Sequence, residues 1–89
     1  MIAYILTIYG KVQGVFYRDF VQENAKKLHI TGWVKNETDG SVSAFVQGER
    51  GNLLALIDIL ETGPSHADVT RIEKTALLPE ESLKEFTIK

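Results

Sequence analysis

Two amphipathic helix patterns, each enclosed by strand-like segments, constrain the fold of this 89-residue chain more than any other feature. The first covers residues 18–28 and has an apolar stripe at helical spacing, made by Tyr17, Val21, Ala25 and Leu28. The second has a stripe of the same kind, made by Leu53, Leu56, Ile57 and Leu60. Asn52 is the expected N-cap of the second helix, and Gly63-Pro64 ends it. Because each helix buries one face only, each needs a sheet to pack against.

Strand patterns fill most of the remaining chain. They cover residues 2–9, 31–36, 41–47 and a stretch within 67–75, with a short last strand that carries Phe86 and Ile88. The second and third of these strands form a hairpin around a turn that contains Asp39-Gly40. Val42, Ala44 and Val46 share one face of this hairpin, and we expect Phe86 and Ile88 to face inward.

The resulting order is βαββαβ with a short terminal strand. Interleaving the two βαβ units and laying both helices on one face of an antiparallel sheet leaves the least apolar surface exposed. We therefore predict an α+β fold of the ferredoxin-like, split βαβ type. No linker or low-complexity segment divides the chain, so residues 1–89 are expected to form a single domain.

Composition narrows the classes of protein that fit. The chain has no cysteine, which removes disulfides and thiolate zinc sites. Its apolar residues come in short runs split by charges, so we expect neither a membrane span nor a secretory signal, and we predict a cytoplasmic protein. The net charge of -2 provides no general attraction for nucleic acid. Any anionic ligand must therefore be bound by a local site that supplies its own positive charge or hydrogen-bond donors.

One segment has the features of an anion-binding site. A glycine-bracketed loop joins the first strand to the first helix, with the sequence Gly10-Lys11-Val12-Gln13-Gly14-Val15-Phe16-Tyr17-Arg18. Helix starts leave N–H groups unpaired and carry positive dipole, and glycine permits the turns that let successive amides converge on one phosphate. Arg18 adds a permanent charge and a fork of donors matched to phosphate oxygens. An ordinary strand-to-helix turn with a solvated arginine is the alternative.

Asn36 closes the second strand, within Gly32-Trp33-Val34-Lys35-Asn36. Its amide can accept and donate hydrogen bonds, and so can fix a water molecule without taking its proton. Turn chemistry is the simpler explanation of an asparagine at this place. We expect the first and second strands to lie side by side, which would bring Asn36 close to Arg18. Lys35 should point to the opposite face.

At these two segments the chain resembles the acylphosphatase family. The first motif is Ile8-x-Gly10-x-Val12-Gln13-Gly14-Val15-x-x-Arg18, and the second is Gly32-Trp33-Val34-Lys35-Asn36-x-x-x-Gly40-x-Val42. The resemblance continues more weakly through Gly63-Pro64 to Phe86-x-Ile88, and so covers essentially the whole chain. Departures are Tyr17, where the family more often has phenylalanine, and Ser43, where an acidic residue is frequent.

The resemblance implies hydrolysis of small acyl phosphates to a carboxylate and inorganic phosphate. Arg18 would bind the phosphate together with the backbone amides of the loop, and Asn36 would orient the attacking water. The amides in question belong to Val12, Gln13, Gly14, Val15, Phe16, Tyr17 and Arg18. No cofactor or metal ion is implied, and we hypothesise that a phosphate oxygen of the substrate takes the proton of the water.

Other functions occur on the same topology, so the fold alone does not decide the function. An RNA-recognition domain needs stacking aromatics, but the third strand offers only Phe45. A non-catalytic module that binds a phosphate-bearing ligand or carbamoyl phosphate is the more serious alternative, and retention of both Arg18 and Asn36 favours the enzyme. His29 and His66 are interpreted as surface or capping residues. We expect a monomer that binds neither nucleic acid nor membranes.

Overall fold

The computed structural model describes all residues from Met1 to Lys89. Seven elements follow one another in the predicted order: β1 (Ile2–Lys11), α1 (Tyr17–Lys27), β2 (Thr31–Asn36), β3 (Val42–Gly48), α2 (Arg50–Thr62), β4 (Asp68–Leu77) and β5 (Phe86–Ile88). Their bounds lie within two residues of those expected from the sequence patterns, except that α2 begins three residues before its expected start. The βαββαβ order and the short terminal strand are both confirmed.

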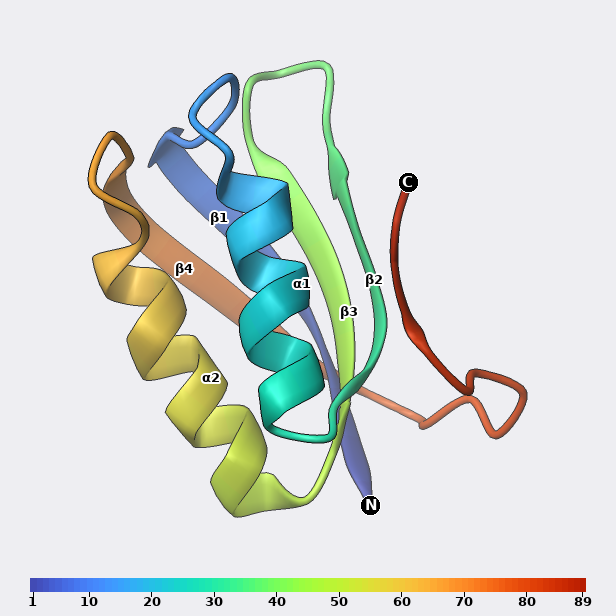
Figure 1. Cartoon of the computed structure of the whole chain (residues 1–89). Coiled ribbons are helices and arrows are strands. Elements are labelled where there is room, and N and C mark those ends of the chain that lie inside the picture. Colours follow the sequence, from blue (N-terminus) through green and yellow to red (C-terminus); the bar gives the residue numbers. More distant parts are fainter.

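One sheet of five strands, ordered β4-β1-β3-β2-β5, forms one layer, and both helices lie on the same face of it (Figure 1). The predicted ferredoxin-like α+β fold is confirmed. The four long strands pair antiparallel, but β5 pairs parallel to β2, so the sheet is mixed where we expected an antiparallel one. The loop before β5 brings the chain back to the edge of β2 in the same direction as β2 itself.

The expectation that β1 and β2 are neighbours was wrong. β3 lies between them and pairs with both, because the tight hairpin holds β3 against β2 and the crossover through α1 passes over one strand position. This leaves Asn36 two strands away from β1 within the sheet. Asn36 therefore approaches the start of α1 from the opposite wall of a pocket and not along a shared strand pair.

The core lies between the sheet and the two helices. α1 buries the predicted stripe of Tyr17, Val21 and Ala25. Val42, Ala44 and Val46 supply the inner face of β3, as expected, and Phe86 is buried at the sheet edge. The N-cap of α2 is Glu49 and not Asn52, because the backbone at Glu49 is extended and its carbonyl oxygen accepts a hydrogen bond from the N–H of Leu53 at 3.0 Å. Asn52 therefore lies inside the first turn.

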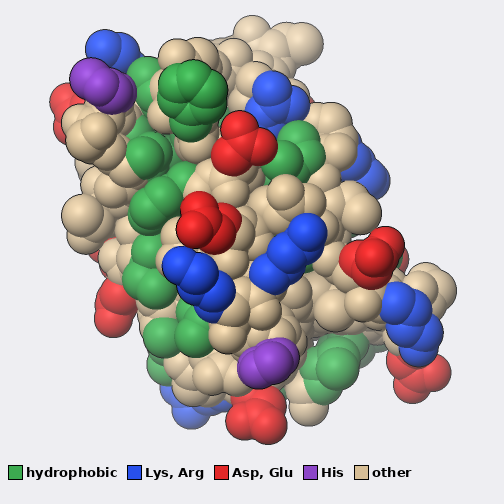
Figure 2. All heavy atoms as spheres, in the orientation of Figure 1, with side chains coloured by type: hydrophobic (Ala, Val, Ile, Leu, Met, Phe, Trp, Pro, Cys, Tyr) green, Lys and Arg blue, Asp and Glu red, His purple; other side chains and the backbone are tan.

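The other face of the sheet carries no helix (Figure 1). Trp33 stacks there on Phe45 with ring centroids 6.3 Å apart, and the ammonium groups of Lys35 and Lys89 lie over the indole. Packing is thus the role of Trp33, as predicted. Figure 2 shows acidic and basic side chains interspersed over the helix-covered side, without a large area of one sign. Neither helix is long and apolar enough to cross a bilayer.

Candidate active site

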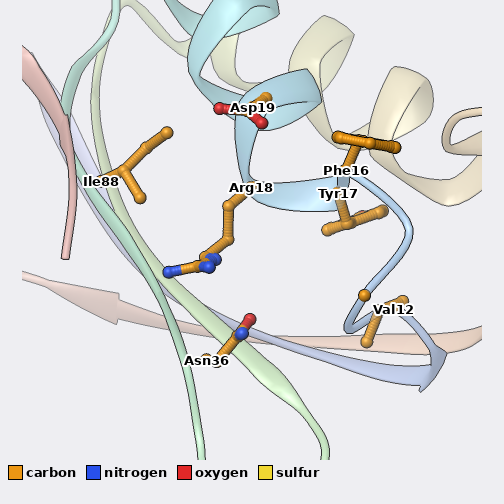
Figure 3. A pocket seen from close by; sticks show the side chains of 8 residues that line it. Val12, Phe16, Tyr17, Arg18, Asp19, Asn36 and Ile88 are labelled. Atoms are coloured by element: carbon orange, nitrogen blue, oxygen red, sulfur yellow. The ribbon is translucent and has the colours of Figure 1, made fainter.

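A pocket of about 310 Å³ opens where β1 ends and α1 begins (Figure 3). It is lined by Val12, Gly14, Phe16, Tyr17, Arg18, Asp19, Asn36 and Ile88. Five of the seven predicted loop residues line it, and so does Asn36 from the end of β2. Two segments that are separated in the sequence therefore meet in one cavity. The predicted proximity of Asn36 and Arg18 is found, although the strand pairing that was expected to produce it is not.

The backbone of the loop adopts two conformations that L side chains rarely take. Gly14 has φ +74°, which glycine accepts without steric cost. Phe16 has φ +61° and forms the N-cap of α1, but no side chain caps the helix there. The N–H groups of the first turn have no acceptor within the helix. Together with the positive end of the helix dipole, they make this wall of the pocket suited to an anion.

Arg18 lies in the first turn of α1, and its side chain extends across the pocket toward Asn36 (Figure 3). Its Nη1 donates a hydrogen bond to the backbone oxygen of Lys89 at 3.0 Å. The N–H of Lys89 in turn donates to the carbonyl oxygen of Val34 on β2 at 2.8 Å. One corner of the guanidinium is thereby tied to the segment after β5, and its remaining donors are left for a ligand.

Asn36 is the last residue of β2 and is exposed, with its amide directed at Arg18 (Figure 3). Its partner in the ladder is Val42 on β3. Lys35 points the other way, as predicted, with its ammonium 5.5 Å from the centroid of the Trp33 ring on the open face of the sheet. An uncharged amide thus faces a guanidinium across a space that can admit a small anion and a water molecule.

Two predicted loop residues, Gln13 and Val15, do not line the pocket. Val15 packs into the core with 7% of its surface exposed. Gln13 turns its side chain to the β2–β3 hairpin, where Nε2 donates to the carbonyl oxygens of Glu37 at 2.8 Å and Ser41 at 2.9 Å. Their proposed contribution was the backbone N–H, which these side-chain positions leave untouched.

Tyr17 reaches the pocket wall but is buried in the core. Its hydroxyl donates to the carbonyl oxygen of Leu60 in α2 at 2.8 Å. Burial raises the pKa of Tyr17 well above its usual range, because the ionised form would lose its hydration. The hydroxyl therefore stays protonated and ties the start of α1 to α2.

Comparisons with known proteins show the family to which the chain belongs. The family model for acylphosphatase matches residues 4–88. An acylphosphatase of Rhizobium etli is 41% identical over 81 residues, which are 91% of this chain and 86% of that protein. The crystal structure of acylphosphatase from Bacillus subtilis superposes with a TM-score of 0.96 at 35% identity, covering 100% of this chain and 99% of that one. The chain belongs to the acylphosphatase family. Its members hydrolyse acyl phosphates, and the chain is an enzyme of this class.

The same fold also occurs inside a longer protein. Full-length HypF in its phosphate- and nucleotide-bound form contains a segment that superposes with a TM-score of 0.86 at 27% identity. This segment matches 99% of the present chain but only 12% of the HypF chain. The acylphosphatases of Rhizobium etli and Bacillus subtilis, in contrast, are matched over most of their length.

Sequence reasoning missed two residues of the acylphosphatase pocket, Asp19 and Ile88. Asp19 follows Arg18 in the first turn of α1, and its place at the same helix start was an available signal. Ile88 was expected to face inward, but its place at the pocket depends on the parallel pairing of β5 with β2. His29 and His66 are both exposed and lie outside the pocket, as predicted.

Proposed function

We propose that Arg18 and the backbone amides of the loop from Val12 to Arg18 bind the phosphate of the acyl phosphate, and that Asn36 orients the attacking water. The observation that carries this proposal is the common pocket, in which the Arg18 guanidinium and the Asn36 amide face one another beside the uncapped start of α1. A cation and a set of N–H donors match the phosphate, and a neutral amide matches the water.

The reaction needs alignment and charge stabilisation more than proton transfer. The water oxygen forms a bond to phosphorus while the bond from phosphorus to the acyl oxygen breaks, and the bonding pair leaves with the carboxylate. This leaving group has a pKa of roughly 4, so it needs no general acid. In a loose transition state the charge spreads over the equatorial phosphoryl oxygens, and in our proposal Arg18 and the amides stabilise that charge. Asn36 contributes by holding the water in line.

The proton of the water goes to a phosphate oxygen of the substrate in our proposal. The products are then a carboxylate and dihydrogen phosphate, so atoms and charge balance for a dianionic acyl phosphate. Asp19 is the only carboxylate that lines the pocket, and it is exposed. Asp19→Asn should keep kcat within about threefold of the unaltered enzyme, whereas a loss of about 100-fold, typical of a removed general base, would transfer the role to Asp19.

Two substitutions test the assignment with benzoyl phosphate as substrate. Arg18→Ala should lower kcat/KM by about 10³-fold and abolish competitive inhibition by inorganic phosphate, since it removes the charge that binds the phosphoryl group. Asn36→Ala should lower kcat by about 10² to 10³-fold while phosphate inhibits as before. Arg71→Ala and Asn52→Ala are matched controls, because both residues lie outside the pocket. Normal turnover by the Asn36 variant would refute its role.

The proposal also describes a monomeric, single-domain, cytoplasmic enzyme that needs no metal ion and binds no nucleic acid. A single carboxylate at the pocket is a poor donor set for a cation, which supports metal independence. Turnover of benzoyl phosphate should therefore be the same with and without EDTA. Phosphate binding without turnover in the unaltered protein would instead identify a binding module.

A further inference from the structure

We infer that the side chain of Gln13 is a positioning residue, which holds the phosphate-binding loop at a set distance from the hairpin that carries Asn36. This inference rests on the proposed roles of the loop and of Asn36, but it concerns a side chain to which those roles assign nothing. Gln13 is half-buried and its side chain turns away from the pocket to the hairpin, so the side chain acts through its neighbours and not on the substrate.

The Gln13 amide joins two segments that are far apart in the sequence. Nε2 donates both of its hydrogens across 24 and 28 positions of the chain, to the carbonyl oxygens of Glu37 and Ser41. These are also the two residues that close the hairpin turn, where the N–H of Glu37 donates to the oxygen of Ser41 at 2.9 Å. Glu37 directly follows Asn36. The clamp therefore grips the hairpin one residue from the group that is proposed to hold the water.

Val12 is buried in the core directly before Gln13, and the side-chain hydrogen bonds from the loop to the hairpin are those of Gln13. Gly14 follows Gln13 in a left-handed conformation, and no atom lies within 4 Å of where its Cβ would be. A glycine with free space around it permits movement of the loop backbone. The two hydrogen bonds of the Gln13 amide, one residue earlier, restrict this movement. At the other end the loop is anchored in the core by Val15 and the Tyr17 hydroxyl bond. The clamp thus controls the part of the loop that faces the hairpin.

The chemistry of the clamp requires a neutral double donor of this length. Two carbonyl oxygens face one nitrogen, so a glutamate would turn an oxygen or a negative charge toward them, and methionine would fill the same space without a donor. Neither carbonyl depends on Gln13 alone, because each also accepts a backbone N–H, from Gly40 at Glu37 and from Glu37 at Ser41. Loss of the clamp should hence free the loop without unfolding the hairpin.

The effect on catalysis depends on how the phosphate-binding loop and the hairpin that carries Asn36 move relative to one another. The phosphate is bound by the loop and Arg18, whereas the water is held on the hairpin by Asn36. Releasing the clamp changes the relation between these two groups and leaves the phosphate contacts within the loop largely intact. Because a displacement of about 1 Å can cost roughly 100-fold in rate, kcat should fall more than phosphate affinity.

The experiment compares Gln13→Met and Gln13→Glu with the unaltered enzyme, using benzoyl phosphate turnover and competitive inhibition by inorganic phosphate. We expect kcat to fall by about 10- to 100-fold for both variants, with the inhibition constant for phosphate changed by less than threefold. Gln47→Met is the matched control. Gln47 is a glutamine whose Nε2 also makes two hydrogen bonds, but it lies at the other end of the same hairpin. This control should lose stability and keep kcat.

A double-mutant cycle separates positioning from a general loss of structure. In the Asn36→Ala background, Gln13→Met should lower kcat by less than twofold, because no oriented water remains to be misplaced. Full multiplicative loss in that background, or a kcat within twofold of normal for Gln13→Met alone, would overturn the inference. If Asn36→Ala by itself keeps normal turnover, the proposed function fails first, and the two failures are thereby distinguished.

Discussion

The two ends of the β2–β3 hairpin are each joined to a neighbouring loop by a glutamine amide, yet only the turn end carries the pocket that Arg18 and Asn36 share, whereas Gln47 lines a different pocket beside the loop before β5. At the turn end, Gln13 reaches in from the loop before α1 and binds the oxygens of Glu37 and Ser41. At the open end, Gln47 reaches out from β3. Its Nε2 donates to Thr31 and to the carbonyl oxygen of Glu80, and its Oε1 accepts from the N–H of Glu80 at 2.7 Å.

The two ends differ in how many of their polar groups have a hydrogen-bond partner within the protein. Gln47 is 2% exposed and every polar atom of its side chain has a partner, so this end closes the loop before β5 against the sheet. At the turn end the Asn36 side chain remains exposed, α1 starts without a side-chain cap, and Phe16 stands in a left-handed conformation with 78% of its surface exposed. Local preferences of stable structure are thus broken at the end that carries Arg18 and Asn36, and are obeyed around the buried Gln47 amide.

The largest effect on stability should come from the Gln47 end of the hairpin. Gln47→Met removes three hydrogen bonds of a buried amide and should lower the free energy of unfolding by about 3 kcal/mol, at roughly 1 kcal/mol per bond. Urea denaturation would measure this. The comparison of the two ends breaks down if Gln47→Met proves as stable as Gln13→Met.

A smaller effect is expected in the buried wall of the pocket. Tyr17→Phe deletes the hydroxyl that donates to Leu60 and should cost about 1.5 kcal/mol at pH 7, with kcat unchanged. This result would sharpen the comparison, because it would show that the Tyr17 hydroxyl at the turn end contributes to stability and not to turnover. A loss of turnover comparable to that of Asn36→Ala would place the hydroxyl in the reaction.

The same tyrosine sets a pH dependence. Burial raises the pKa of Tyr17 above the value of about 10 in the unfolded chain. The native state therefore keeps a proton that the unfolded state releases, so this contribution is complete below pH 10 and is lost as the pH rises further. At pH 11 the difference in stability between the unaltered protein and Tyr17→Phe should be smaller by about 1.4 kcal/mol. Urea titrations at pH 8 and pH 11 measure it, and a constant difference would contradict the assignment.

The smallest effect concerns the left-handed residue at the helix start. Phe16→Val should be about 1 kcal/mol less stable than Phe16→Gly, because a branched side chain is strained at a φ of +61° and glycine is not. Little burial is lost in either variant, since Phe16 is exposed. Thermal unfolding of the pair would test this, and equal stabilities would show that the loop relaxes without cost.

Periodicity and turn residues sufficed for the elements of the fold, whereas the pocket segments were singled out by the two motifs that resemble the acylphosphatase family. The stripes of α1 and α2 and the alternation in β3 follow from burial on one face, which local spacing encodes directly. The N-cap of α2 was misplaced because Asn52 is a good capping residue by type, while the chain turns into the helix at Glu49. Residue type is a weaker guide than the path of the backbone.

The sequence by itself determined that two helices and a set of strands share one core and that a glycine-rich loop precedes the first helix, and it predicted that Arg18 and Asn36 carry the chemistry. Only the tertiary structure decided which groups meet. β3 separates β1 from β2, β5 pairs parallel and brings Ile88 to the pocket, and the Gln13 side chain turns to the hairpin. Spacing along a chain reports which face a residue takes, whereas contacts between distant segments depend on strand order and direction, which arise when the whole sheet is assembled.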